Sequence, residues 1–193
     1  HGTRTMRLVF MGPPGAGKGT QGELLAQYMG IPRLSTGEML REARANRTEL
    51  GRRAQAYMDS GDLVPDEVVL GLVAEALDST RAQEGFILDG FPRTIAQAEG
   101  LNEILDARST PLDGVILLEV PEEELVRRLT GRSADESRTD DDPETVRRRL
   151  QVYQAETEPV IRWYAEQGVR LIAADGVGSI DDIQSGLRGL LDS

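Results

Sequence analysis

The sequence lacks cysteine altogether, and its single histidine is His1, the first residue of the chain. Without cysteine there are no disulfides, no thiolate nucleophiles and no cysteine-based zinc sites. Histidine is confined to residues 1–5, which we interpret as a leader before a natural start at Met6, so imidazole bases and Ser-His triads are disfavoured as well. Catalysis must then rely on arginine, lysine, carboxylates, hydroxyls and a recruited ion. That set favours phosphoryl transfer, in which positioning and charge stabilisation do most of the work.

Lysine is almost as scarce, since 21 of the 22 basic residues are arginine and the only lysine is Lys18. The formal net charge of −11 argues against nucleic acid as a partner, because nucleic-acid binding needs a basic surface. No apolar run approaches the roughly 18 residues of a membrane span, and no signal peptide opens the chain. With 193 residues, of which 39% are hydrophobic, the sequence predicts one globular domain. We expect it to be cytoplasmic and monomeric, without a membrane partner.

The lone lysine lies in a glycine-rich stretch, Gly12–Thr20, between an apolar run and an amphipathic segment. A strand, a glycine loop and a helix in this order are typical of a phosphate-binding loop, because the backbone N–H groups and the helix N-terminus attract anions. Lys18 would reach the terminal phosphates, and Thr20 would face a hydrated Mg²⁺, although the hydroxyl follows one position later than the strict pattern requires. A glycine-rich connector is the alternative interpretation. The residues predicted to bind ATP here are Gly12, Gly15, Ala16, Gly17, Lys18, Gly19 and Thr20.

Apolar runs and amphipathic segments alternate along the rest of the chain. The pattern predicts strands at 8–11, 31–34, 86–88, 114–120 and 169–174. It predicts helices at 17–29, 37–45, 49–60, 66–79, 95–107, 122–130 and 180–191, and a long helix from Pro143 onward that Pro159 kinks or splits. Ser35 and Thr36 are N-cap candidates, and the polar segment 131–142 is predicted to be a loop, with Asp142 capping the next helix. The alternation predicts a parallel sheet with helices on both faces.

Asp89 directly follows the buried strand 86–88. In a parallel sheet such a strand end faces the same crevice as the phosphate loop. A carboxylate there can hold Mg²⁺ through its water shell, since that ion dehydrates reluctantly. A turn or cap role for Asp89 is the alternative.

Three motifs follow one another along the chain: GPPGAGKGT at 12–20, STGEMLR at 35–41 and DGFPRT at 89–94, with a fourth region between Gly131 and Arg149. Together they resemble the nucleoside monophosphate kinases, and among these the short-lid adenylate kinases, over the whole chain from Met6. The resemblance implies an α/β P-loop three-layer fold with a five-stranded parallel sheet flanked by helices. It implies a core domain at 6–34, 65–132 and 143–193, a helical AMP-binding insertion at 35–64 and a short lid at 133–142. The implied activity is reversible, Mg-dependent phosphoryl transfer from ATP to AMP, which yields two ADP and maintains the adenine nucleotide balance.

The resemblance also assigns roles to single residues. Beyond the loop, it implies that ATP is bound by Arg128, lying flat on the adenine, and by Arg132 and Gly178. AMP binding is implied for Thr36, Gly37, Arg41, Asp62, Leu63, Val64, Gly90, Arg93, Gln97, Arg138 and Arg149. The implied catalytic residues are Lys18, Arg93, Arg132, Arg138 and Arg149, and Mg²⁺ would be held through water by Asp89 and Thr20. Helical phase alone leaves Arg147 and Arg149 equally placed, and the spacing of the family favours Arg149.

The sequence departs from the family pattern in two places. Glu38 stands where aspartate is usual, and the segment between Arg132 and Asp141 is too short, and too poor in cysteine, for the larger lid with a structural zinc. Two alternatives remain open at this stage. One is the same chemistry on UMP, CMP or GMP, although Thr36 and Gln97 favour AMP. The other is a nucleotide-dependent switch, which uses a phosphate loop but has no use for Arg41, Arg93 and Gln97.

Overall fold

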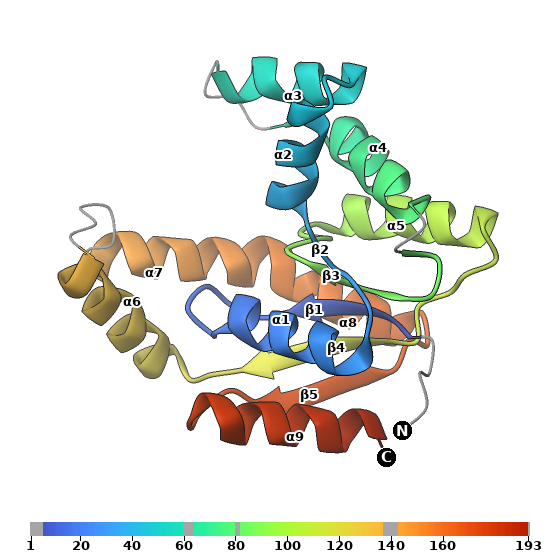
Figure 1. Ribbon diagram of the computed structural model, residues 1–193. Helices are drawn as coiled ribbons and strands as arrows, with labels where there is room; N and C mark the ends of the chain where they lie inside the picture. The colour runs from blue at the N-terminus through green and yellow to red at the C-terminus, as the bar shows by residue number, and fades with distance from the viewer. Residues whose placement is uncertain (1–5, 60–63, 80–81, 137–142, 193) are drawn as a thin grey trace.

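The computed structural model describes residues 6–59, 64–79, 82–136 and 143–192, and its centre is a parallel sheet (Figure 1). The five strands are β1 (Arg7–Met11), β2 (Arg33–Ser35), β3 (Phe86–Asp89), β4 (Gly114–Glu119) and β5 (Leu171–Asp175). They are arranged in the order β2-β3-β1-β4-β5, and every neighbouring pair is parallel. The predicted α/β fold with a five-stranded parallel sheet is therefore confirmed. Because β1 and β3 are neighbours in register, with Phe10 beside Asp89, the segments that follow them emerge at the same edge.

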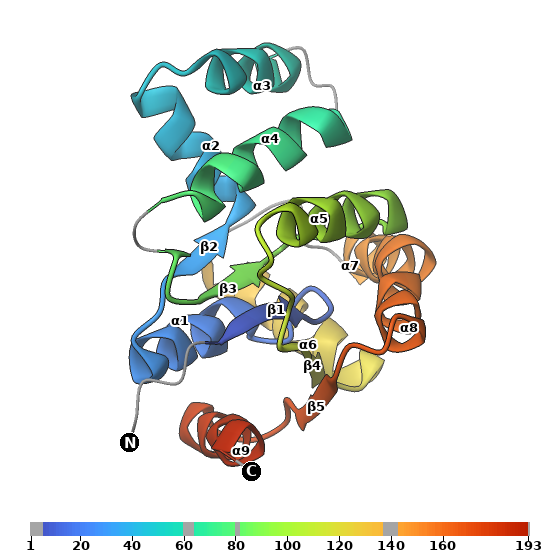
Figure 2. The same ribbon diagram turned by 90° about the vertical axis from the view of Figure 1, so that its right-hand side faces the viewer.

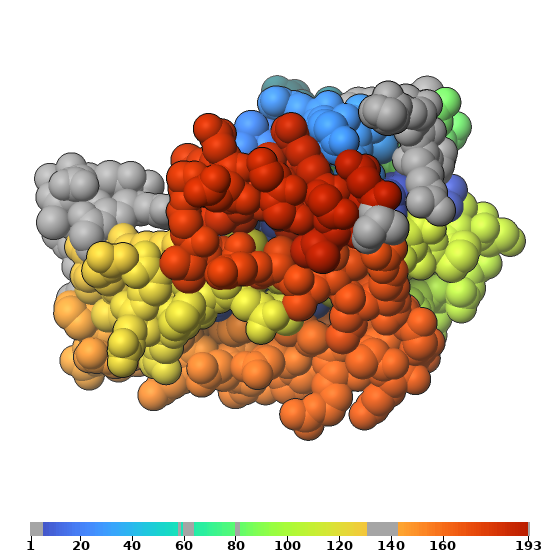
Figure 3. All heavy atoms as spheres, turned by 90° about the horizontal axis from the view of Figure 1, so that it is seen from below, coloured from blue at the N-terminus to red at the C-terminus, as the bar shows by residue number. Residues whose placement is uncertain are grey.

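Alternate residues of the strands pack against helices on the two faces of the sheet. On one face, Leu8, Phe10 and Ile116 join the buried side chains of α1 (Lys18–Met29) and α9 (Ile180–Asp192). On the other, Val9 and Leu88 join those of α5 (Ile95–Ala107) and α8 (Glu158–Glu166). Burial of both faces explains why the central strands read as continuous apolar runs. In Figure 3, the view from below, α9 (red) lies on the surface of the molecule.

Three further helices form a block beyond the β2 edge of the sheet (Figure 2). They are α2 (Thr36–Ala45), α3 (Glu49–Asp59) and α4 (Asp66–Leu77). A small apolar core of its own holds the block together, built from Ala43, Ala54, Val68 and Leu72. The C-terminal half of α4 instead packs into the main core through Val73 and Leu77. Helix α4 thus links the block to the sheet, while α2 continues directly from β2.

Most of the predicted element positions agree with the structure, and one local difference has a physical reason. Ser35 caps α2, since its Oγ accepts a hydrogen bond from the Glu38 backbone N–H at 3.2 Å, as predicted. Helix α6 (Glu122–Glu136) continues six residues past the predicted end at Thr130, so the prediction of a loop from Gly131 is wrong there. The extension carries no apolar period, but its Arg132, Ala134 and Glu136 are good helix formers, so a helix can continue there.

The long helix predicted from Pro143 is divided, as Pro159 suggested. It comprises α7 (Pro143–Val152), a π-helical turn η2 (Tyr153–Thr157) and α8. Pro159 occupies the first turn of α8, where the missing N–H of proline leaves no intrahelical bond unmade. Within the described ranges, no helix combines the length and the apolar character that a membrane span requires.

Candidate active site

The loop between β1 and α1 is shaped by glycines in the left-handed region. Gly15 and Gly17 both have φ of 85°, and a Cβ atom on Gly15 would lie 2.8 Å from Cγ of Leu129 on α6. Helix α1 begins at Lys18, and the Gln21 N–H makes the first intrahelical bond, to the Gly17 carbonyl at 3.0 Å. The amides of residues 18–20 therefore lie at the open N-terminus of the helix, without a side-chain cap from Gly17. Such an arrangement is suited to an anion with several oxygens.

Lys18 and Asp89 form an ion pair across the two strand ends. The Asp89 side chain is only 3% exposed, and Lys18 Nζ contacts its Oδ1. Its other oxygen, Oδ2, accepts from Arg33 Nε at 2.9 Å and lies 2.9 Å from Arg33 Nη2. The carboxylate predicted to serve Mg²⁺ therefore lies beside the phosphate loop, with both oxygens paired to cations. Thr20, the second predicted Mg²⁺ residue, is exposed on the first turn of α1.

A second group of predicted residues meets where β3 turns into α5. Gly90 has φ of 82°, and a Cβ placed on it would lie 3.5 Å from Arg93 Nη2 and 3.8 Å from Thr36 Oγ1. Gln97 Oε1 accepts from the Arg93 backbone N–H at 2.8 Å, and Gln97 Nε2 donates to Asp66 Oδ1 at 2.9 Å. Four residues predicted to bind AMP, namely Thr36, Gly90, Arg93 and Gln97, are thus neighbours in space.

Arg93 is anchored by its backbone and its side chain independently. Its carbonyl accepts from Thr157 Oγ1 at 3.0 Å, and its N–H is bonded to Gln97 as described. The guanidinium donates through Nε to the Gly90 carbonyl at 2.9 Å, and the residue is exposed. One edge of the guanidinium is therefore held while the rest faces solvent, which suits a planar fork that binds a phosphate.

Arg128, on α6, bridges the phosphate loop and the segment after β5. Its Nη1 lies 3.4 Å from the carbonyl oxygens of Gly15 and Ala16, and Nη2 donates to the Gly176 carbonyl at 2.8 Å. Glu124, one turn earlier, accepts from Arg128 Nε at 3.0 Å. Hydrogen bonds from Arg127 and Arg128 lower the pKa of Glu124. The side chain predicted to lie on adenine is therefore fixed against the loop that would hold the phosphates.

Comparison with known proteins adds an independent line of argument. The family model described as Adenylate kinase matches residues 10–169 of the chain. An adenylate kinase of Thermus thermophilus is 50% identical over 184 residues, which cover 95% of this chain and 96% of the relative. An adenylate kinase of Leptospira biflexa is 50% identical over 177 residues, covering 92% and 95%, and one of Thermodesulfovibrio yellowstonii is 46% identical over 214 residues, covering 97% and 99%.

The chain belongs to the adenylate kinase family. The resemblance drawn from the motifs is thereby confirmed. So is the enzyme class that it implied, an ATP:AMP phosphotransferase.

The other residues assigned from the adenylate kinase resemblance fall in less defined surroundings. Arg41 lies over the start of α2, since a Cβ on Gly37 would be 3.4 Å from its Nη1. Arg149 is exposed on α7, as are Arg147 and Arg148, so burial does not separate the three. Val64 is half-buried beside the helical block, and Gly178, with φ of 129°, lies two residues beyond Gly176. The backbone of Arg132 is helical in α6, whereas Asp62, Leu63 and Arg138 lie outside the described residues.

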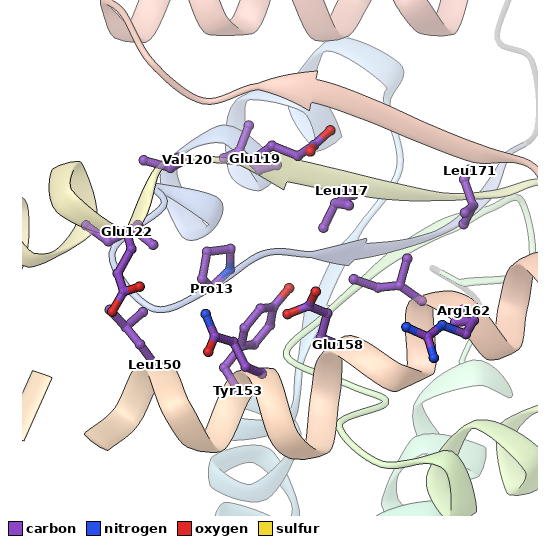
Figure 4. Close-up of a pocket in the computed structure, with 14 residues that line it drawn as sticks. Pro13, Leu117, Glu119, Val120, Glu122, Leu150, Tyr153, Glu158, Arg162 and Leu171 are labelled. Atoms are coloured by element: carbon purple, nitrogen blue, oxygen red, sulfur yellow. The ribbon is translucent and has the colours of Figure 1, made fainter. Parts of the chain in front are cut away.

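A separate cavity of about 380 Å³ lies between β4 and the helices α7 to α8 (Figure 4). Leu117, Leu150 and Ile161 are among its apolar walls, and Tyr153 and Glu158 are among its polar lining residues. Burial, together with the negative charge of Glu158, raises the pKa of Tyr153 to about 12. None of the described residues predicted to contact nucleotide lines this cavity. The residues predicted to bind nucleotide gather instead at the strand ends around Lys18, Asp89 and Arg93.

Two residues that support the site carry no signal in the sequence. Arg33 lies in a predicted strand, outside every motif, and Thr157 lies just before the helix-splitting Pro159. Each reaches its partner only through the tertiary fold: Arg33 is 56 residues from Asp89, and Thr157 is 64 residues from Arg93. Only the position of Arg33 two residues before the STGEMLR motif could have drawn attention to it.

Proposed function

We propose that this chain transfers the terminal phosphoryl group of ATP to AMP in a single in-line step, giving two ADP, in a site shared between the strand ends of β1 and β3. The observation that carries the proposal is that two groups of residues suited to binding phosphate lie at one edge of the sheet. The phosphate loop with Lys18 follows β1, and the cluster of Thr36, Gly90, Arg93 and Gln97 lies where β3 ends. Two nucleotides bound there would present their phosphates to each other.

The binding site for the donor, ATP, would be formed by the phosphate loop together with α6. The free amides at the start of α1 and the Lys18 ammonium would bind the β- and γ-phosphates. Arg128, held against the loop carbonyls and Gly176, would offer its planar face to the adenine. Gly178 follows on the same segment and would leave space for the base.

The binding site for the acceptor, AMP, would be formed by α2 and the start of α5. Arg93 and Arg41 would bind the AMP phosphate, since both guanidinium groups lie at the N-terminal ends of these helices. Gln97 carries an amide that can both donate to and accept from a base edge, and Thr36 lies close by. We assign Asp62, Leu63 and Val64 to the same pocket. In this proposal residues 35–64 are the acceptor-binding insertion, 133–142 the lid, and the remainder from residue 6 the core.

Mg²⁺ fits the residues that are present. Asp89 and Thr20 are hard oxygen donors beside the phosphate loop, and no group of three or more potential metal ligands occurs within the part of the chain that the structure describes. Two donors suffice for an ion that keeps most of its waters and takes phosphate oxygens as further ligands. When bound, the ion would neutralise charge on the β- and γ-phosphates.

The chain's own part in the reaction is positioning and charge neutralisation. No protein base is required, because an acceptor phosphate is already largely ionised near neutral pH. Lys18, Arg93, Arg132, Arg138 and Arg149 would surround the moving group and stabilise the charge on its equatorial oxygens. Closure of the insertion and the lid would exclude water, which would otherwise accept the phosphoryl group.

All of the residues assigned to the two nucleotide-binding sites belong to one chain, so we propose that a monomer is sufficient for activity. Its partners would be ATP, AMP and ADP, with neither nucleic acid nor membrane, and its place the cytoplasm, where these nucleotides occur.

A ligand that joins two adenosines through five phosphates tests whether two nucleotide-binding sites face each other. Such a ligand is expected to bind at one molecule per chain, which isothermal titration calorimetry would measure. It should also compete with both ATP and AMP in steady-state kinetics. A nucleotide-dependent switch has one nucleotide-binding site. If the two-adenosine ligand binds no more tightly than ATP alone, the arrangement of two facing sites is contradicted.

A further inference from the structure

Asp89 is a nearly fully buried carboxylate that has two cationic partners rather than one. Lys18 contacts Oδ1, while Arg33 binds Oδ2 through Nε and Nη2, both at 2.9 Å. The Lys18 side chain is 24% exposed and that of Arg33 17%. The proposed mechanism gives Lys18 a task elsewhere, on the ATP phosphates. It gives none to Arg33.

Arg33 is seated much more firmly than a surface arginine. Its side chain lies along α1 where that helix carries Gly19 and Gly22: a Cβ on Gly22 would be 3.5 Å from Arg33 Cδ and Nε, and a Cβ on Gly19 would be 3.5 Å from Nη2. The remaining nitrogen, Nη1, lies 3.3 Å from Oε1 of Glu38 and 3.6 Å from Oε2 of Glu23. The glutamate at position 38, where the family usually has aspartate, therefore helps to hold this arginine.

The two cations differ in their freedom to leave the carboxylate. Lys18 is a single ammonium on a flexible stem, whereas all three guanidinium nitrogens of Arg33 lie beside carboxylate oxygens of Asp89 or Glu38. A buried carboxylate left without any partner is strongly destabilising. If Lys18 were the only partner of Asp89, its transfer to a phosphate would leave that charge unpaired.

We infer that Arg33 is a positioning residue which keeps Asp89 paired and in place while Lys18 moves to the nucleotide phosphates. Its positive charge also repels the Lys18 ammonium across the shared carboxylate, which further favours the release of Lys18. The inference rests on the proposed role of Lys18 in ATP binding. It predicts that removing Arg33 weakens the binding of ATP in particular, because Lys18 is then retained by Asp89.

The test uses Arg33→Met, Arg33→Lys and a matched control, Arg108→Met. Arg108 lies at the C-terminal end of α5, pairs with the exposed carboxylate of Asp78 and has no assigned role. Calorimetry without Mg²⁺ would give the Kd of ATP and of AMP separately, so that no ion bound near Asp89 enters the comparison. We expect Arg33→Met to raise the Kd of ATP about tenfold and that of AMP less than about twofold. Arg33→Lys, which keeps a cation beside Oδ2, should recover most of the ATP affinity.

The results that would overturn the inference differ from those that concern the proposed function. An unchanged ATP Kd in Arg33→Met, or equal losses for ATP and AMP, would mean that Arg33 is only a structural ion pair. If Arg33→Met fails to fold, Arg33→Gln decides: it keeps a donor without the charge, and it should lose ATP affinity while Arg33→Lys retains it. Failure of the unmodified chain to phosphorylate AMP would instead contradict the proposed function, and the ATP titrations would still decide the role of Arg33.

Discussion

Replacing Lys18 by methionine is expected to lower the turnover of ATP and AMP by about 10³-fold, the scale on which charged groups aimed at a transferring phosphoryl act. Methionine retains roughly the length of the side chain but not its charge. Asp89 keeps Arg33 as its partner, so the carboxylate stays paired in the variant. Steady-state kinetics with both substrates varied would measure the effect. Because the interaction strengthens in the transition state, kcat should fall together with kcat/KM.

A second substitution, of Lys18 by arginine, separates the charge of the side chain from its shape. Lys18→Arg keeps the charge but introduces a planar fork into a loop shaped for a slim ammonium, so it should remain strongly impaired. Arg108→Met should retain full turnover. Near-normal turnover of Lys18→Met would show that the loop only holds nucleotide and takes no part in the transfer.

Arg93→Ala should lower kcat by about 10²-fold or more, on the scale of losing one stabilising donor. The structure makes this substitution informative, because the backbone of residue 93 is anchored without the guanidinium. Its N–H is bonded to Gln97 and its carbonyl to Thr157, and an alanine would keep both bonds. The loss should therefore report the missing charge and not a displaced turn. The KM for AMP should rise in the same assay, whereas the KM for ATP should change much less.

The matched control is Arg170→Ala. Arg170 is exposed just before β5, at the opposite end of the parallel sheet from the phosphate loop, and its side chain donates to the Leu190 carbonyl at 3.2 Å. It should leave kcat unchanged. An Arg93→Ala enzyme with the turnover of Arg170→Ala would remove Arg93 from the transfer step.

Local patterns predicted the framework of the site well, because the signals that build it are local. The glycine loop, the Ser35 cap and the first helical residue Pro143 each act within one or two turns of chain, and each lies where the sequence predicted. Asp89 could be placed beside the loop because strand order in a parallel sheet brings strand ends to one edge. The π-helical turn Tyr153–Thr157 could not be predicted, since Pro159 marks a break without specifying its geometry.

The supporting contacts required the tertiary fold. Arg33 reaches Asp89 only because β2 pairs with β3, which brings Ser35 beside Asp89. Thr157 reaches Arg93 only because α8 packs against α5. Neither pairing leaves a periodic or motif signal in the sequence. The motifs and their resemblance to a family therefore pointed to the residues proposed to face substrate, but not to those that hold them in place.

If both substrates are adenine nucleotides that meet at one edge of the sheet, the enzyme should select AMP from a panel of nucleoside monophosphates. The enzyme would receive ATP and Mg²⁺ with AMP, UMP, CMP or GMP, and the nucleoside diphosphates formed would be separated and quantified. We expect AMP to be phosphorylated far faster than the other three, two ADP to appear for each ATP consumed, and little free phosphate to be released. Preference for UMP, CMP or GMP, or release of phosphate without an acceptor product, would contradict this expectation.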